Sequence, residues 1–320
     1  MSSAYEAPAL EEIEDAARRI AGTIVHTPLV RLPVEGPAEI FLKLENLQPI
    51  GSFKLRGAAN ALALLDRPEL EAGVWTASAG NMAQAVAWHA RELGIPCAVI
   101  VPDTAPRTKR DAVARLGAEI LEVPVATWFE VFETRSYPGM SGVFVHPFSD
   151  PGVMAGNGTI GMEIVEDLPE VDAVLVPYGG GGLACGIAAA LRALVPRCRV
   201  YACEVETAAP FSASLAAGEP VEVEHVASFV DGIGAPRVFP EMFPLARRLL
   251  DDSIVVSPGA TADAVRLLVE RVRVVAEGAG AAAVAAAATG RAGAGMLVCI
   301  VSGGNIDSPV LKTILSGKTP

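Results

Sequence analysis

Short apolar runs rich in β-branched residues alternate along most of the chain with stretches of helical pattern. In the helical stretches, of which 82–93 and 183–194 are the clearest, apolar residues recur at three- and four-residue spacing. This repeated succession of strand, helix and strand predicts an α/β fold, with parallel or mostly parallel twisted sheets flanked by helices. We expect the strands at 73–77, 97–101, 119–123, 173–177, 200–204 and 296–302.

Two stretches that contain glycine and proline, 66–73 and 137–142, are the best candidates for domain boundaries. They predict a large domain formed by residues 1–66 and 143–320, and a small mobile domain of three or so strands, residues 67–142. Ligands of open parallel sheets bind at the carboxyl ends of the strands. Function is therefore expected in the loops that follow strands.

The composition narrows the classes of partner. The 320 residues are 51% hydrophobic and carry a net charge of −12, so nucleic acid and an anionic membrane would both repel the chain, and a small molecule fits better. No basic stretch precedes an apolar core at the N-terminus, and the apolar run 279–288 is too short to span a bilayer, which predicts a cytoplasmic protein. The five cysteines lack Cys-x-x-Cys spacing, which favours structural thiols.

Lysine is scarce in this chain, and one of its five lysines, Lys54, lies in the run Gly-Ser-Phe-Lys-Leu-Arg-Gly at 51–57. An ammonium between Phe53 and Leu55, with glycine on both flanks, is expected to be partly desolvated, which lowers its pKa and frees the amine. A neutral lysine amine can act as a base or form a Schiff base with an aldehyde. Lys54 is therefore the candidate catalytic residue, and a surface lysine at a helix start is the simpler alternative.

A run of four glycines follows the strand expected at 173–177 and precedes a helix. Such a loop and helix start present free backbone N–H groups to a phosphate, here from Gly179, Gly180, Gly181, Gly182 and Leu183. The loop leaves an alternative open, because Gly179-x-Gly181-x-x-Ala184 followed by Glu204 also fits the dinucleotide pattern of nicotinamide dehydrogenases. Against that alternative, the pattern lies past mid-chain and leaves Lys54 without a role.

Two more polar loops follow expected strands. In the loop 76–84, Ser78, Asn81 and the free N–H groups of the next helix could bind a carboxylate, and the Asn81 amide could reach a phenolate oxygen. A plain N-cap is the structural alternative for Ser78. In the loop 302–305, Ser302 could face an aromatic nitrogen or cap a turn. An amine for an imine, glycines for a phosphate, an amide for a phenol and a hydroxyl for a ring nitrogen match the polar groups of pyridoxal phosphate.

Five segments also carry a family resemblance: GSFKLRGA from Gly51, SAGNMAQ from Ser78, PYGGGGL from Pro177, AEGAGA from Ala276 and VSGGNID from Val301. In order and spacing they resemble the fold-type II (tryptophan synthase β-like) pyridoxal-phosphate enzymes, and above all the threonine/serine dehydratase (ammonia-lyase) and serine racemase group. The resemblance covers 26–308. It implies that the large domain binds pyridoxal phosphate and that the chain forms a homodimer.

The resemblance implies a reaction in amino-acid catabolism: elimination of water from threonine, serine or a related β-hydroxy-L-amino acid, which gives a 2-oxo acid and ammonia. Lys54 would form the covalent link to the cofactor and later remove the Cα proton. Phe53 and Gly232 would lie beside the cofactor ring, Asn81 would bind the ring oxygen, and Ser302 would contact the ring nitrogen. The phosphate would lie on the loop from Gly179 to Leu183, and would protonate the departing hydroxyl.

Several positions depart from the group's pattern on the substrate side, for which we expect Ser78, Ala79, Gly80, Asn81, Met82 and Asn157. The racemases of the group have a serine at the place of Ala79, and alanine cannot donate a proton, so racemisation is disfavoured. Met82 stands where histidine or phenylalanine is common, and Asn157 where glutamine is usual. With Ser149, they predict a reshaped pocket, and hydroxyaspartate, phenylserine or a hydroxylated diamino acid are alternative substrates to threonine.

Some relatives bind a divalent cation through a Glu, a backbone carbonyl and an Asp. Glu204 and Ala208 occupy two of these places, but Pro210 replaces the Asp. A hard divalent ion loses a charged ligand there, so we expect a monovalent ion or none. The chain ends soon after Ser308, which predicts no regulatory domain and no feedback control by isoleucine.

Other functions stay open as alternatives. Cysteine-synthase-like β-replacement uses the same fold, but its members have threonine after the asparagine of the Gly-Asn segment, where this chain has Met82. An amino-acid racemase is disfavoured by Ala79. A binding protein that kept the fold and lost catalysis is disfavoured by the intact Lys54, Asn81 and Ser302.

Overall fold

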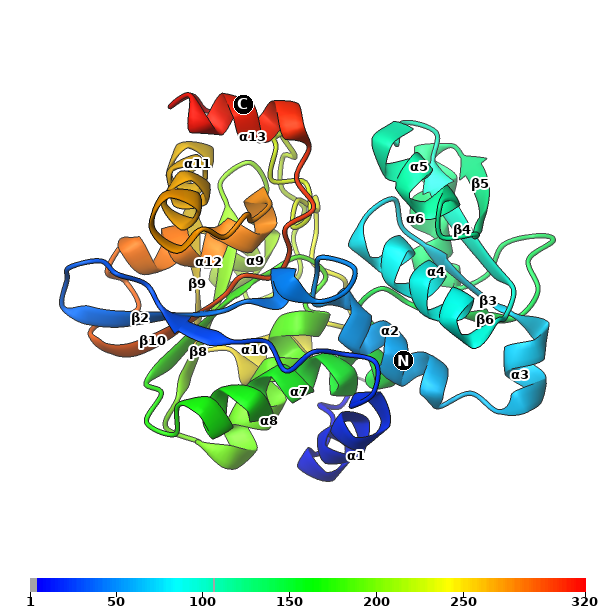
Figure 1. The fold of residues 1–320 in the computed structure, drawn as a ribbon, viewed down its shortest axis with the longest axis horizontal. Coiled ribbons are helices and arrows are strands. Elements are labelled where there is room, and N and C mark those ends of the chain that lie inside the picture. Colours follow the sequence, from blue (N-terminus) through cyan, green and yellow to red (C-terminus); the bar gives the residue numbers. More distant parts are fainter. Residues whose placement is uncertain (1–4, 106) are drawn as a thin grey trace.

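A computed structural model describes residues 5–105 and 107–320 of the chain. It contains a six-stranded sheet in the order β1-β2-β10-β7-β8-β9 and a four-stranded sheet in the order β5-β4-β3-β6. The four-stranded sheet and its helices form the cyan and green lobe of Figure 1, beside the larger lobe built on the six-stranded sheet. Every strand pair is parallel except β1 with β2. The predicted α/β class with mostly parallel sheets is confirmed.

The strands follow the expected alternation, with additions at the sheet edges. The predicted strand at 119–123 and the one at 173–177 have these bounds in the structure, and the other four shift by one or two residues. The sequence pattern missed β1, β2, β6 and β9, so the smaller sheet has four strands rather than three. The strands are β1 (Leu29–Arg31), β2 (Ala38–Lys43), β3 (Val74–Ala77), β4 (Cys97–Pro102), β5 (Glu119–Val123), β6 (Val143–Phe144), β7 (Ala173–Pro177), β8 (Arg199–Val205), β9 (Asp252–Val256) and β10 (Gly295–Ile300).

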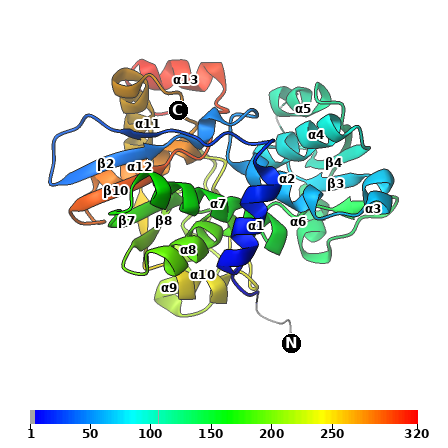
Figure 2. The same ribbon diagram turned by 60° about the horizontal axis from the view of Figure 1, so that its bottom comes forward.

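Helices cover both sheets. They are α1 (Leu10–Ile20), α2 (Lys54–Ala63), α3 (Arg67–Ala72), α4 (Asn81–Leu93), α5 (Arg107–Ala114), α6 (Val125–Thr134), α7 (Pro151–Asp167), α8 (Gly182–Leu194), α9 (Pro210–Ala217), α10 (Phe243–Leu249), α11 (Pro258–Leu267), α12 (Gly278–Ala288) and α13 (Ser308–Leu315), with a 3₁₀ turn η1 (Glu45–Leu47) and a π turn η2 (Leu268–Val272). Figure 2 shows α1 lying across α2, α7 and α8 on one side of the molecule.

The large sheet is buried on both faces because its side chains alternate between two cores. Along β7, Val174 and Val176 pack with residues of α7, α8 and α10, whereas Ala173 and Leu175 pack with α11 and α12. Helix α12 is almost entirely alanine and glycine, which lets its backbone lie close to the sheet. Apolar burial on both faces explains the continuous hydrophobic runs of these strands.

The chain enters and leaves the smaller lobe at the same place, where two segments of its backbone are in close contact. The Val143 N–H donates to the Gly73 carbonyl oxygen at 3.0 Å. A Cβ at Gly142, whose φ is 82°, would overlap that carbonyl, so glycine is required there. The segment between these two glycines builds strands β3 to β5. The domain division at 67–142, and the mobility of the small domain, stay predictions.

The cysteine side chains are reduced and shielded. Cys185, Cys198, Cys203 and Cys299 are buried, and Cys97 is partly exposed. Burial raises the pKa of the thiols of Cys97 and Cys185 to about 12. Within 5–105 and 107–320, no helix combines the length and apolar character needed to cross a membrane.

Candidate active site

The carboxyl ends of β3, β7 and β10 face a single cavity of about 530 Å³ between the two sheets. The loop after β3 contributes Ser78 to Asn81, the loop after β7 contributes the four glycines, and the loop after β10 contributes Ser302. This is the edge at which parallel sheets bind ligands. Three of the loops singled out in the sequence therefore line one pocket with Lys54.

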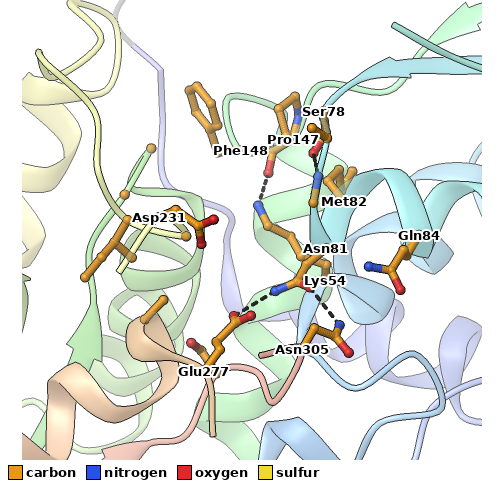
Figure 3. A pocket seen from close by; sticks show the side chains of 18 of the residues that line it. Lys54, Ser78, Asn81, Met82, Gln84, Pro147, Phe148, Asp231, Glu277 and Asn305 are labelled. Carbon is orange, nitrogen blue, oxygen red and sulfur yellow. Dashed lines mark hydrogen bonds between the residues drawn. The ribbon is translucent and has the colours of Figure 1, made fainter. Parts of the chain in front are cut away.

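Lys54 is the first residue of α2, and its amine lies inside this cavity (Figure 3). Its Nζ donates to the carbonyl oxygen of Pro147 at 2.6 Å and lies 5.1 Å from the centroid of the Phe53 ring. Desolvation lowers the pKa of Lys54 to about 8, although the charge of Glu277 opposes that shift. The amine is therefore much closer to neutrality at physiological pH than an ordinary lysine.

Backbone pairing fixes the segment before Lys54 against the loop after β10. The Phe53 N–H donates to the Ser302 carbonyl at 2.9 Å, and the Gly304 N–H donates to the Gly51 carbonyl at 2.9 Å. Ser302 is 3% exposed and lines the cavity. Two segments about 250 residues apart in sequence are thus held side by side, and Lys54 and Ser302 border the same space.

Behind Lys54, helix α2 is anchored by a buried ionic network. Arg56 is fully buried and donates to both oxygens of Glu45, at 2.8 Å each, and to both oxygens of Glu163, at 2.7 and 2.8 Å. Burial alone would raise the pKa of Glu45, but the Arg56 guanidinium outweighs it and the pKa is lowered. Lys43 pairs with Glu163 at 2.7 Å. The network joins α2, α7, η1 and β2 and so fixes where Lys54 starts.

The glycine loop after β7 is a cradle that larger residues would fill. A Cβ at Gly180 would overlap the ring of Phe148, and a Cβ at Gly182 would overlap its backbone. Gly181 has a φ of 88°, which favours glycine. Among the described residues, the N–H groups of Gly179, Gly180 and Gly181 have no hydrogen-bond acceptor. Free donors at the N-terminus of α8 are suited to a phosphate.

The loop before α4 presents Ser78, Ala79, Gly80, Asn81 and Met82 to the cavity. Gly80, and not Ser78, is the N-cap of α4; the Ser78 hydroxyl accepts from the Gly80 N–H at 3.2 Å. The Asn81 Nδ2 donates to Glu277 Oε1 at 2.8 Å, and its Oδ1 accepts from Asn305 Nδ2 at 2.8 Å. Figure 3 shows this chain of contacts beside Lys54.

The sequence reasoning missed Glu277 as a residue of the site. It lies in the AEGAGA segment, directly before α12, and lines the cavity. Withdrawal from bulk water and the nearby charge of Asp231 raise the pKa of Glu277 to about 7. An acidic residue at a helix start beside glycines was the available signal. The site therefore holds an amine and a carboxyl that both titrate near neutral pH.

The structure does not bring every candidate residue to the pocket. Gly232 lines it, as expected. Asn157 does not: it is 1% exposed inside α7, where its side-chain oxygen lies 3.0 Å from the position of a Cβ on Gly57. Ser149 is also buried away from the cavity and donates to Glu241 Oε1 at 3.0 Å. Both were expected on the substrate side because they depart from the pattern of the group that the chain resembles. Asn157 instead lies in the core within α7, and Ser149 lies in the core just before that helix.

Glu204, near the end of β8, accepts hydrogen bonds from the protein itself. Its two oxygens accept from the N–H groups of Phe211 and Ser212 at 2.8 Å each, and from the Ser253 hydroxyl at 2.6 Å. Ala208 lies in the turn between β8 and α9. Among the described residues, no group of three His, Cys, Asp or Glu side chains has the arrangement of a metal site. Glu204 holds the start of α9.

Comparison with known proteins identifies the class. The model of the pyridoxal-phosphate-dependent enzyme family matches residues 20–303. The chain belongs to this family. The L-threonine ammonia-lyase of Thermotoga maritima is 41% identical over 96% of this chain and 78% of its own length. The catabolic L-threonine dehydratase of Escherichia coli K12 is 38% identical over 96% of both chains.

A structural comparison agrees. Maize serine racemase superposes with a TM-score of 0.87 at 32% identity, over 96% of both chains. The predicted resemblance to fold-type II enzymes of the threonine dehydratase and serine racemase group is confirmed, and pyridoxal phosphate is the cofactor. The glycine loop therefore belongs to a pyridoxal-phosphate enzyme, and the nicotinamide alternative is not supported.

The pocket fits this cofactor in charge and shape. The N–H groups of the glycine loop lack acceptors within the described residues and suit a phosphate, and Phe148 leaves no room for a larger residue at Gly180. The Lys54 amine, with its lowered pKa, suits an aldehyde. These two features line the same cavity.

Proposed function

We propose that this enzyme is an ammonia-lyase that removes water from a β-hydroxy-L-amino acid, such as threonine or serine, and releases a 2-oxo acid and ammonia. The observation that carries the proposal is the Lys54 amine with a pKa of about 8, inside a pocket that also holds the glycine loop. The names of relatives with 41% and 38% identity, an L-threonine ammonia-lyase and an L-threonine dehydratase, support the reaction class.

The residues proposed to hold the cofactor line the cavity from both lobes, most of them from the larger one. Gly179, Gly180, Gly181, Gly182 and Leu183 would hold the phosphate, Phe53 and Gly232 would border the ring, Asn81 would reach the ring oxygen and Ser302 the ring nitrogen. When bound, pyridoxal phosphate supplies an electron sink that stabilises negative charge at the substrate Cα. The Ser302 hydroxyl is neutral and would not keep the ring nitrogen protonated as a carboxylate would, so the electron sink would be weaker, which suits elimination.

Lys54 is the proposed base. In its neutral form the amine takes the Cα proton of the substrate, and the pKa of about 8 makes this form accessible near pH 7. The Glu277 carboxyl, with a pKa of about 7, tunes the charge of Lys54 and holds Asn81 in place through a 2.8 Å hydrogen bond. Ala79 offers no donor to the opposite face, so the proton is not returned there and racemisation is disfavoured.

The loop before α4 is the proposed carboxylate site. The Ser78 hydroxyl and the free N–H groups at the start of α4 can bind the substrate carboxylate. Gly80 has open space at its Cβ position, so the backbone there is accessible to a ligand. Met82 is 1% exposed and closes the pocket floor behind this loop.

Some finer features remain proposals. We infer a homodimer in the cytoplasm, with residues 67–142 moving as a small domain that closes over the substrate and excludes water from the reacting carbon. We propose that the place formed by Glu204 and Ala208 holds a monovalent cation or no ion. Three protein donors already saturate much of the Glu204 carboxylate.

The replacement Lys54→Ala tests the function. Ammonia release from L-threonine and L-serine is expected to fall about 10²- to 10⁴-fold, because the base is lost. The variant should also fail to form a borohydride-reducible link to pyridoxal phosphate, which mass spectrometry detects. Lys312→Ala, an exposed lysine in α13, is the control and should retain both properties. A Lys54→Ala variant with parental ammonia release would overturn the proposal.

A further inference from the structure

One side of the pocket is a wall of aromatic side chains. Trp128, Phe129 and Phe132 come from α6, and Phe148 and Phe239 come from loops of the larger lobe; all five line the cavity. The chain has ten phenylalanines and three tryptophans, so this wall concentrates a large part of its aromatic content. We name these five residues the aromatic wall.

The wall is continuous across the two lobes. Ring centroids lie 4.6 Å apart for Trp128 and Phe132, 4.5 Å for Phe148 and Phe239, and 6.1 Å for Phe132 and Phe148. Phe132 and Phe239 are 5% and 8% exposed and form its packed base, whereas Trp128, Phe129 and Phe148 are only partly buried. Phe132 and Phe239 therefore fix the positions of the wall's rings, and the other three rings offer apolar surface to a ligand.

The wall starts at the reacting centre. Lys54 Nζ contacts the carbonyl oxygen of Pro147, the residue directly before Phe148 (Figure 3). The Phe148 ring packs against Gly180 of the phosphate loop, where a Cβ would overlap it. A substrate whose Cα lies within reach of Lys54 therefore shares its cavity with this apolar surface, which is available to the substrate side chain. The methyl group of threonine covers little of such a surface.

The polar groups beside the wall are uncharged, paired or at the rim; among the described residues, the buried Trp128 Nε1 and His146 Nε2 have no hydrogen-bond partner. The His146 ring packs edge-on against Phe148 and Phe132, at centroid distances of 4.5 and 5.9 Å. Its Nδ1 accepts from the N–H groups of Phe148 and Ser149, at 3.3 and 2.9 Å, so this ring is neutral. Lys109 and Asp231, which also line the cavity, pair with each other. The remaining basic residue at the rim, Arg115, is exposed.

We propose that the preferred substrate class is a β-hydroxy-α-amino acid with an aromatic substituent on Cβ, which stacks on the aromatic wall. This inference rests on the proposed elimination. In 3-phenylserine the Cα–H and Cβ–O bonds break and one water leaves. The free enamine becomes an imine, whose hydrolysis takes up one water, so that the products are phenylpyruvate and one ammonia.

The test compares three substrates with the enzyme loaded with pyridoxal phosphate. We expect kcat/KM for L-threo-3-phenylserine to exceed that for L-threonine about tenfold or more, because a buried ring gains far more than a methyl group. L-threo-3-hydroxyaspartate, which would need a cation at the wall, should be the poorest substrate. Calorimetry should also find tighter binding of L-phenylalanine, which lacks the leaving hydroxyl, than of L-alanine.

Variants locate the effect. Trp128→Ala and Phe129→Ala should each lower the phenylserine-to-threonine ratio of kcat/KM about tenfold, because one edge of the ring loses its contact. Trp88→Leu, an aromatic residue of α4 outside the cavity, is the matched control and should keep the ratio.

Two results would overturn the inference and leave the proposed function intact: threonine or hydroxyaspartate as the best substrate, or a ratio that neither wall variant changes. Failure to release ammonia from any of the three substrates, by enzyme that carries the cofactor, would instead overturn the proposed function and this inference with it. The two failures are therefore distinguishable.

Discussion

Lys54 and Glu277 control each other's charge at the centre of the pocket. Desolvation lowers the pKa of the amine to about 8, and the carboxylate partly opposes that change. In return, Lys54 is one of the groups that hold down the pKa of Glu277, which burial raises to about 7. Both groups therefore change charge within the range in which an enzyme of this kind works.

The variant Glu277→Gln tests this coupling. Without the negative charge the pKa of Lys54 should fall below 8, so the neutral fraction at pH 7, about a tenth for a pKa of 8, should rise several-fold. The acidic limb of the pH profile, where activity grows as the amine deprotonates, should move to lower pH. Reductive methylation of Lys54 against pH, followed by mass spectrometry in protein without cofactor, measures the pKa directly.

The matched control is Asp307→Asn. Asp307 also lines the cavity but is not among the charges that shift Lys54. It should leave the titration of Lys54 in place. A Glu277→Gln profile that moves to higher pH, or an equal movement in the Asp307 variant, would contradict the coupling.

At this scale, residue chemistry predicted part of the site. Lys54, Asn81 and Ser302 could be proposed from the sequence because each has a polar functional group in a telling position. Lys54 lies between glycines, and Asn81 and Ser302 lie in loops that follow expected strands. Glu277 could not be assigned a role, because its partner Asn81 lies 196 residues away in sequence. Asn157 was expected on the substrate side because it stands where glutamine is usual in the group that the chain resembles, and only the folded structure shows that it is buried inside α7, away from the cavity.

Among the helices, α2 matters most for the site, because it begins with Lys54 and is held in place by Arg56. The guanidinium fills hydrogen-bond positions on two buried carboxylates, from η1 and α7. Such a network adds little net stability over an apolar core, but loss of one partner leaves buried charges unpaired.

Arg56→Met should destabilise the protein by about 3–5 kcal/mol, because Glu45 and Glu163 would lose their shared partner. Urea unfolding followed by circular dichroism measures the free energy of unfolding. Arg67→Met, at an exposed pair with Glu71, is the control and should change it by less than about 0.5 kcal/mol. Equal effects of the two variants would show that the buried network does not anchor α2.

Elements differ in how well pattern predicts them. Strands β5 and β7 are apolar or alternating runs bounded by Pro or Gly, and their bounds were predicted. Strand β2 was missed because its charged ends, Glu39 and Lys43, do not resemble a buried strand; Lys43 is tolerated because Thr27 and Glu163 bind its ammonium at 2.7 Å. Strand β6 has only two residues, and pairing with β3 alone defines it.

For the whole molecule, ion pairs cross between the small sheet's helices and one irregular segment of the larger lobe. Lys109 of α5 pairs with Asp231, and Glu133 of α6 pairs with Arg237. The side chains of all four are partly exposed, so these pairs are weak and sensitive to salt. Lys109 and Asp231 line the cavity, and both pairs join the two lobes, so a closure over a substrate would act on them.

We expect Glu133→Gln and Arg237→Met each to raise KM about two- to fivefold at low salt, with no further rise in the double variant, because both remove the pair that joins the lobes. The second pair of Arg237, with Glu222 at 3.8 Å, lies within the larger lobe. Salt at 1 M should abolish the difference from wild type, since it screens surface charges. Arg110→Met, which breaks a pair with Glu122 inside the small sheet, is the control. Additive effects, or an equal effect of the control, would argue against a closing contact.

The shielding of the thiols makes the proposed closure accessible to measurement. Four cysteines are buried, and the high pKa of the thiol of Cys97 keeps it protonated, so none competes for a maleimide dye at neutral pH. Cysteines introduced in place of Arg91 on α4 and Lys312 on α13, both exposed, can therefore carry a donor and an acceptor fluorophore in the native background. Energy transfer between them would show whether the two lobes approach each other during a single turnover.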